Sequence, residues 1–414
     1  MGLCQENLRC ASPLSVIPRI EEPQLQREKL LFTPGPLTTS ESVKQAMMRD
    51  LGSRDREFIE LVQNIRQRLL QVGSAQDRGY EAILMQGSGT FAVESVISSV
   101  IPRNGKLLVA INGAYGRRMV QIAKTLGIMT ESIVTPESQP IDVGQVEKML
   151  AREPGITHVG AIHCETTTGM LNPVEALGKV VRQSGRVLIV DAMSSFGGMP
   201  LPVADWSIDF LVSSANKCIQ GVPGFGFVLA RRDLLVESEG RARSLSLDLT
   251  AQWKGLEADG QFRFTPPTHT LLAFWQALEE LQAEGGVSER AARYAANKRA
   301  LTEGMSTLGF ESYLAPEHQS DIITSFRYPK HPKFSFPEFY ERLSVKGFVI
   351  YPGKVSDADC FRIGTIGHIF PKDVEALVAA VGETMQEMGI AQAQTVSSAE
   401  KTQGPRTTGA SSTS

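Results

Sequence analysis

Residues 187–191 have the sequence Val187-Leu188-Ile189-Val190-Asp191, in which four aliphatic residues are followed directly by a carboxylate. A short apolar run without polar alternation is typical of a strand that is covered on both faces of a sheet. Similar runs recur between residues 80 and 230, and amphipathic stretches separate them. Because strands and helices alternate, we predict an α/β fold with a mainly parallel sheet. The predicted strands are residues 81–85, 107–111, 129–134, 159–163, 187–190, 210–213 and 225–230.

Helix signals lie between these strands. Asp142 is a candidate N-cap for residues 143–150, and Asn172 with Pro173 at the first helical position is a candidate start for the helix through residue 181. After residue 268 the pattern changes to long helices, at 271–283 and, with Ser288 as its cap, from 288 to about 308. We then expect a strand at 322–328, a helix at 336–343, a strand at 348–351 and a last helix at 372–388.

The length of 414 residues exceeds what one hydrophobic core usually supports, so we expect two folded units. The change of pattern places a large domain at residues 28–287 and a smaller C-terminal α+β domain at 288–390. Residues 1–27 are predicted to be a flexible extension. Residues 391–414 are polar and nearly free of branched aliphatic side chains, which predicts a disordered tail.

The composition excludes several classes of protein. The chain has 42 Lys and Arg against 45 Asp and Glu, a net charge of −3, which argues against nucleic acid or an acidic membrane as main partner. No apolar run approaches the ~18 residues of a spanning helix. The scattered cysteines and histidines give neither a disulfide framework nor metal-ligand spacing, so no metal site is expected. We predict a reducing compartment, with the cytoplasm favoured and a mitochondrial location left open.

A glycine-rich segment, Gln86-Gly87-Ser88-Gly89-Thr90, lies between a predicted strand and a predicted helix. Its backbone N–H groups therefore fall at a helix N-terminus, where they form a nest that binds phosphate. The segment matches neither the dinucleotide motif nor the P-loop motif. On its own it is equally compatible with a plain strand-to-helix turn.

Asp191 and Lys217 each follow an apolar strand, at the sheet edge where open α/β proteins bind ligands. Taken singly, Asp191 could be a helix cap and Lys217 a solvated loop residue. Together with the nest they are the parts that pyridoxal phosphate chemistry requires. The lysine supplies an imine, the carboxylate keeps the pyridine nitrogen protonated, and the nest anchors the phosphate.

Ten segments of the chain resemble the class V aminotransferases of fold type I, enzymes that depend on pyridoxal 5'-phosphate. The likeness spans about residues 30–388 and excludes both ends of the chain. The segments that carry it are TPGPLTTS (33–40), QGSGT (86–90), NGAYG (112–116), ETTTGMLNP (165–173), DAMSSFGG (191–198), SSANKCIQGVPG (213–224), SLSLDL (244–249), PTHT (267–270), VIYPGK (349–354) and CFRIGTIG (360–367).

The resemblance implies a role for each of nine residues. Lys217 carries the imine and Asp191 pairs with the ring nitrogen, whereas Thr167 faces the cofactor O3′. A homodimer with shared active sites follows from Thr268, which reaches the phosphate of the neighbouring subunit. Phosphate binding is assigned to Ser88, Gly89 and Thr90, ring stacking to Tyr115, and recognition of the anionic end of the substrate to Arg362.

The implied reaction moves the amino group of 2-aminoethylphosphonate to pyruvate by ping-pong chemistry, giving phosphonoacetaldehyde and L-alanine. Arg362 suits both substrates, because a guanidinium fork binds a phosphonate or a carboxylate bidentately. Thr38, Thr39 and Ser40 are further candidates near the phosphonate, with capping of the following helix as the alternative.

Three other functions remain open from the sequence. The chain could be another class V aminotransferase, using alanine or serine with glyoxylate or pyruvate. It could be a lyase or cysteine desulfurase with Cys218 or Cys360 as nucleophile, although burial of Cys218 as a small apolar residue is the more ordinary interpretation. A binding module that has lost its cofactor is the non-enzymatic alternative.

Overall fold

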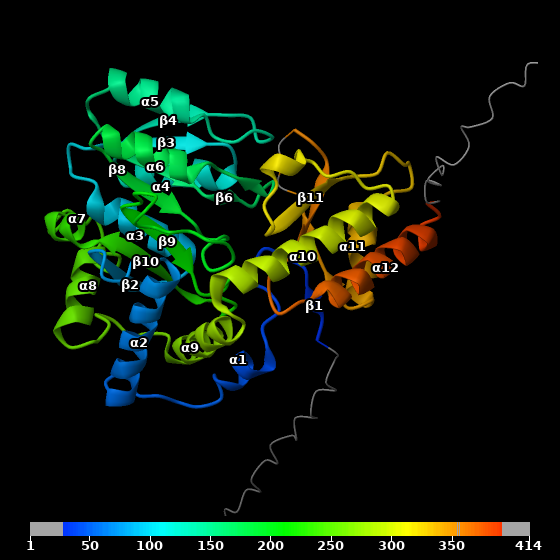
Figure 1. The fold of residues 1–414 in the computed structure, drawn as a ribbon, viewed down its shortest axis with the longest axis horizontal. Coiled ribbons are helices and arrows are strands. Elements are labelled where there is room, and N and C mark those ends of the chain that lie inside the picture. The colour runs from blue at the N-terminus through cyan, green and yellow to red at the C-terminus, as the bar shows by residue number, and fades with distance from the viewer. Residues whose placement is uncertain (1–27, 354, 356, 391–414) are drawn as a thin grey trace, which may run out of the picture.

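The computed structural model describes residues 28–353, 355 and 357–390. The predicted extension at 1–27 and the predicted tail at 391–414 lie outside the described residues. Figure 1 shows two units side by side, a large one built on a central sheet and a smaller one to which α10, α11 and α12 belong. No helix in the described ranges is long and apolar enough to cross a membrane.

The large unit contains a seven-stranded sheet in which every strand predicted between residues 80 and 230 is present. The strand order is β2-β10-β9-β8-β5-β3-β4. β10 runs opposite to the other six strands, which share one direction, so the predicted α/β fold with a mainly parallel sheet is confirmed. The strands are β2 (Tyr80–Gly87), β3 (Lys106–Ile111), β4 (Met129–Val134), β5 (Ile156–Ile162), β8 (Val187–Asp191), β9 (Phe210–Ser214) and β10 (Gly224–Arg231).

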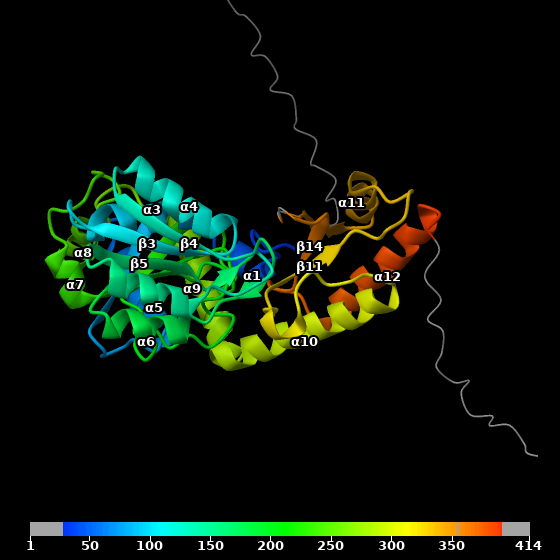
Figure 2. The same ribbon diagram turned by 90° about the horizontal axis from the view of Figure 1, so that it is seen from above.

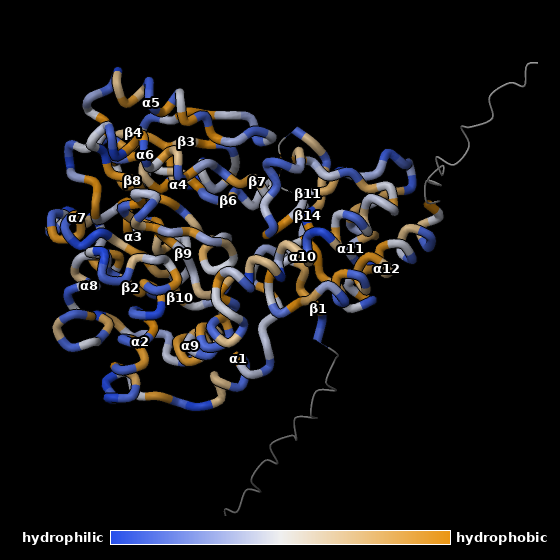
Figure 3. The backbone as a smooth tube through the Cα atoms, viewed as in Figure 1, coloured by the Kyte–Doolittle hydropathy of each residue, from blue (hydrophilic) through white to orange (hydrophobic). Residues whose placement is uncertain are grey.

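Helices cover both faces of this sheet. Figure 2 shows α3 and α4 on one face and α5 and α6 on the other. The strands are buried between these layers, and Figure 3 shows hydrophobic residues concentrated at the sheet. The helices of this unit are α1 (Glu41–Gln45), α2 (Arg56–Val72), α3 (Gly89–Val100), α4 (Ala114–Thr125), α5 (Val143–Arg152), α6 (Val174–Gln183), α7 (Arg232–Glu237), α8 (Leu249–Ala258) and α9 (Thr268–Ala283).

The predicted helix caps have mixed outcomes. The Asp142 side chain accepts the Gln145 N–H at the start of α5, which confirms that cap. The prediction for α6 was wrong, because Pro173 is the N-cap residue and Asn172 is buried in hydrogen bonds with Asn112. Ser288 was also wrong as a cap, since α10 begins at Gly286.

The smaller unit packs its helices on an antiparallel sheet of order β11-β14-β13 and has its own hydrophobic core. The predicted strand at 348–351 is split, because Ile350 turns into this core. Residues 348–349 of the predicted strand join one sheet, and residue 351 joins another. The elements are α10 (Gly286–Thr307), η1 (Pro316–His318), β11 (Ile323–Arg327), α11 (Phe336–Val345), β12 (Phe348–Val349), β13 (Tyr351–Pro352), β14 (Cys360–Gly364) and α12 (Pro371–Glu387).

The start of the described chain joins the smaller unit. β1 (Leu30–Leu31) pairs in parallel with β12, and the Gly364 N–H donates to the Phe32 carbonyl at 2.9 Å. Residues 33–40 then lead from this sheet to α1, which packs on α9 of the large unit. The short hairpin of β6 (Cys164–Glu165) and β7 (Met170–Leu171) follows β5. Segments far apart in the sequence therefore meet between the two units.

We expect Gly364→Ala to lower the free energy of unfolding by about 1–3 kcal/mol, as overpacking does. A Cβ at this position would lie 2.3 Å from the Thr33 carbonyl oxygen and force the N-terminal segment off β14. Urea unfolding measures the effect, with Gly155→Ala as control, since its added methyl meets nothing within 4 Å. A Gly364→Ala protein as stable as the control would contradict this packing.

Candidate active site

A cavity of about 200 Å³ opens where β5, β8 and β9 end. These carboxyl ends form the edge at which open α/β sheets bind ligands. Strand ends and helix starts supply its polar side chains, and six residues predicted from the sequence come together here. They are Ser88, Gly89, Thr90, Tyr115, Asp191 and Lys217.

The Lys217 amine is held at one side of the cavity. Its Nζ donates to the carbonyls of Pro34 at 3.0 Å and Gly35 at 3.1 Å. Gly35 has a φ of +106°, and a Cβ there would lie 2.6 Å from Lys217 Cδ. The position therefore needs glycine both for its backbone conformation and for the close approach of the lysine. The N-terminal segment is thus part of the lysine site.

The glycine-rich segment leads into α3 at the cavity wall. Ser88 is the N-cap residue, yet its side chain forms no cap hydrogen bond. The first N–H groups of a helix have no partner within the helix, so they suit an anion. Position 89 has room only for glycine, because a Cβ there would clash with the Met193 side chain.

Asp191 is a buried carboxylate at the end of β8. Its Oδ1 accepts the Met193 N–H at 2.9 Å. Burial raises its pKa to about 6, against the opposing effects of that hydrogen bond, Arg118 and Lys217. Among the described residues no salt bridge reaches this carboxylate, so a cationic ring nitrogen suits its charge.

Glu165 was missed by the sequence analysis, although it too follows an apolar strand. Its side chain is fully buried, and burial raises its pKa. One oxygen accepts the N–H groups of Tyr115 and Gly116, and the other accepts the Thr167 hydroxyl at 2.8 Å. The carboxylate therefore fixes the start of α4 and with it the Tyr115 ring.

Arg118, one turn along α4, was also missed, because an arginine among surface residues of a helix gives no distinct sequence signal. It lines the cavity, with its guanidinium 4.9 Å from the Tyr115 ring centroid. Nη1 donates to the Thr90 hydroxyl at 3.4 Å. This cation contacts the glycine-rich segment and interacts electrostatically with Asp191, so it favours negative charge at both.

Three predicted site residues do not line the cavity. Thr167 is fully buried against Glu165, and Thr166 occupies the cavity wall instead. Thr268 is the first residue of α9, and its hydroxyl lies 3.5 Å from His269 Nδ1.

Arg362 lies behind the wall. It is 2% exposed and donates from Nη1 to the Thr166 carbonyl at 2.8 Å and from Nε to the Pro352 carbonyl at 2.9 Å. Burial lowers its pKa, and within the described ranges no carboxylate forms a salt bridge with it. A buried cation of this kind suits an anionic ligand that comes within reach.

The two candidate thiol nucleophiles are buried outside the cavity. Cys218 donates from Sγ to the Ser194 carbonyl at 3.1 Å, and burial raises its pKa. Burial also raises the pKa of Cys360 to about 11. Both environments disfavour the reactive thiolate. In the part of the chain that the structure describes, no group of three His, Cys, Asp or Glu side chains could hold a metal ion.

A family model described as aminotransferase class-V matches residues 38–338. The chain is 55% identical over 361 residues to the 2-aminoethylphosphonate–pyruvate transaminase of Syntrophobacter fumaroxidans, covering 87% of this chain and 97% of that protein. It is 53% identical over 363 residues to the enzyme of the same name from Vibrio vulnificus, with 87% and 99% covered.

The fold is also shared with a solved structure. The ureidoglycine–glyoxylate aminotransferase of Bacillus subtilis superposes with a TM-score of 0.82, covering 90% of this chain and 97% of that one. The two sequences are 20% identical, so this likeness concerns the fold alone.

We expect Asp191→Asn to stabilise the cofactor-free chain at neutral pH by up to about 3 kcal/mol, at about 1.4 kcal/mol per pKa unit. The pKa of the folded carboxyl is raised from 3.8 to about 6, so the folded state binds its proton more tightly than the unfolded state. Stability therefore falls as pH rises through this window. Below it both states are protonated, and the difference between parent and variant disappears.

Thermal unfolding of both proteins from about pH 4 to about pH 8 measures this difference. The asparagine can still accept the Met193 N–H, so the comparison isolates the charge. A stability difference that does not change with pH would contradict the raised pKa.

Proposed function

The chain belongs to the aminotransferase class-V family, and from this we propose that it moves the amino group of 2-aminoethylphosphonate to pyruvate with pyridoxal 5'-phosphate as cofactor. The products are phosphonoacetaldehyde and L-alanine. The observation that carries this proposal is the identity of 52–55% to relatives of that name over at least 96% of their length. The cavity supports it independently, because it gathers an amine, a buried carboxylate and a glycine-rich helix start.

The residues present suit pyridoxal phosphate. The first turn of α3, from Ser88 to Thr90, would hold the phosphate, and Tyr115 would lie against the ring. Asp191, which lacks a salt bridge among the described residues, would face the ring nitrogen. When bound, the cofactor supplies an electron-withdrawing ring that stabilises negative charge on the substrate carbon next to the amino nitrogen.

Lys217 moves the protons in the proposed reaction. Its amine would be the attachment point for the cofactor aldehyde, and it would be free to act as a base once a substrate amine is bound in its place. Nζ would then accept the proton from the substrate carbon that bears nitrogen. The carbonyls of Pro34 and Gly35 restrict where this amine lies, so it stays within reach of that carbon.

Arg362 is the proposed group for the anionic end of either substrate. The guanidinium binds phosphonate and carboxylate with the same pair of N–H donors, which explains how one site serves both half-reactions. Its contact with the Thr166 carbonyl places it next to the cavity wall. Glu165 interacts electrostatically with Arg362 and also orients the start of α4. The anion-binding Arg362 and the ring-stacking Tyr115 are therefore both positioned by Glu165.

A homodimer is part of the proposal. Phe91 and Phe264 are exposed large hydrophobic residues, and the Gln86 side chain donates to the Phe264 carbonyl at 2.9 Å. This apolar face adjoins the glycine-rich segment. A second copy covering it would bring Thr268, which follows Phe264 closely in the chain, towards the neighbouring phosphate site.

The direct test supplies the protein with pyridoxal phosphate, 2-aminoethylphosphonate and pyruvate. We expect L-alanine and phosphonoacetaldehyde in equal amounts, with ping-pong kinetics. Lys217→Ala should lose almost all turnover together with the visible absorbance of the lysine-linked cofactor. Faster turnover of alanine or serine with glyoxylate, or a ternary-complex kinetic pattern, would contradict the proposal.

We expect Arg362→Lys to raise KM for both substrates by about tenfold, since a point charge replaces the fork and one charge-assisted hydrogen bond is lost. Steady-state kinetics with each substrate varied in turn measures this. Arg327→Lys is the matched control, because Arg327 lies on the neighbouring strand β11 and is exposed. Unchanged KM values for both substrates would remove Arg362 from the binding site.

A further inference from the structure

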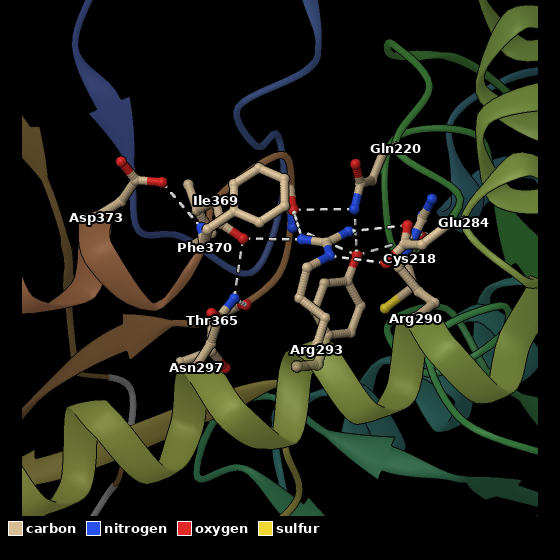
Figure 4. Close-up of polar contacts among 12 residues, drawn as sticks. Cys218, Gln220, Glu284, Arg290, Arg293, Asn297, Thr365, Ile369, Phe370 and Asp373 are labelled. Atoms are coloured by element: carbon tan, nitrogen blue, oxygen red, sulfur yellow. Dashed lines mark hydrogen bonds and ion pairs between the residues drawn. The ribbon is translucent and has the colours of Figure 1, made fainter.

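Helix α10 places a row of polar side chains between the two units, shown in Figure 4. Arg290 is the most buried of its charged residues, at 1% exposed. Its Nη1 donates to the Cys218 carbonyl at 2.8 Å, and its Nε pairs with Glu284 at 2.5 Å. Since Cys218 directly follows Lys217, this guanidinium binds the backbone carbonyl of the residue next to the lysine.

The rest of the loop after Lys217 is held by the same helix. The Tyr294 hydroxyl donates to the Cys218 carbonyl at 3.3 Å, so this oxygen has two donors from α10. The Gln220 side chain donates to the Tyr294 oxygen at 2.6 Å and to the Gly367 carbonyl at 2.9 Å. Gln220 itself has a φ of +69°, which a non-glycine residue keeps only when its surroundings fix it.

The same face of the helix also holds the segment that follows β14. Arg293 Nη1 donates to the carbonyls of Gly367 and Ile369, each at 2.8 Å. Asn297 donates to the carbonyls of Thr365 and Ile369, each at 3.0 Å. β14 carries Arg362, so one face of α10 fixes both the lysine loop and the strand of the anion-binding arginine.

We propose that Arg290 is a positioning residue for Lys217, which sets where the amine lies relative to Arg362. Burying a guanidinium is costly, and an apolar side chain could fill the same space without that cost. What arginine provides, and an apolar side chain would not, is a hydrogen-bond donor to the Cys218 carbonyl. This inference rests on the proposed function, because it concerns the use of Lys217 as the attachment point.

The test measures how fast Lys217 bonds to added pyridoxal phosphate, followed by visible absorbance in the absence of substrates. Arg290→Met should slow this step by about ten- to a hundredfold, the scale of a displaced reacting group. Arg290→Lys keeps a donor of different geometry and should recover part of the rate. Tyr294→Phe keeps Arg290 and the buried ring but removes the second donor to Cys218, together with the oxygen that accepts from Gln220. It tests the same contacts to the lysine loop if Arg290→Met does not fold.

Two control variants separate positioning from stability. Glu284→Gln weakens the ion pairs to Arg290 and Arg293 but leaves the donor to Cys218, so it should lower the unfolding midpoint while the bonding rate stays near that of the parent. Arg299→Met changes an exposed arginine of the same helix and should alter neither.

The outcomes separate failure of the proposed function from failure of the positioning role of Arg290. If the parent forms no covalent bond with pyridoxal phosphate, the proposed function fails. If the parent does and the Arg290 and Tyr294 variants bond at the parental rate, the positioning role is overturned. It is overturned as well if the rate falls in proportion to stability in Glu284→Gln, because the arginine is then only a structural residue.

Discussion

The hydrogen bonds between the Lys217 amine and the carbonyls of Pro34 and Gly35 are the constraint on which the rest of the site depends. They hold an amine beside a buried carboxylate at the end of a parallel strand. Asp191 is costly to ionise there, since its pKa is raised to about 6 by burial. The ionised Asp191 carboxylate therefore destabilises the fold, and a cationic ring would offset this cost. Active-site groups commonly lower the stability of a protein in this way.

Two separate links bring the halves of this site together. The N-terminal segment runs from β1, in the smaller unit, past Lys217 to α1 in the large unit. Helix α10 joins the loop after Lys217 to the segment after β14. Both links include hydrogen bonds to backbone carbonyls and do not rest on apolar packing alone. Such contacts define distances between groups more closely than non-directional burial does.

The sequence predicted the sheet well because buried parallel strands have a distinctive composition, as in Val187–Asp191. It failed at Asn172, whose amide is used in a buried pair with Asn112 that no local pattern reveals. The amine, the carboxylate and the glycine-rich segment were found because each follows a strand. Glu165 and Arg290 were missed because their importance comes from partners far away in the sequence, at Tyr115 and Cys218.

The proposed function requires that the Lys217 amine is the group that joins the cofactor. Reduction of the protein with borohydride in the presence of pyridoxal phosphate fixes this bond, and peptide mass mapping then locates it. We expect one modified site per chain, on the peptide that contains Lys217. Modification of a different lysine, or equal labelling of many surface lysines with none at Lys217, would contradict it.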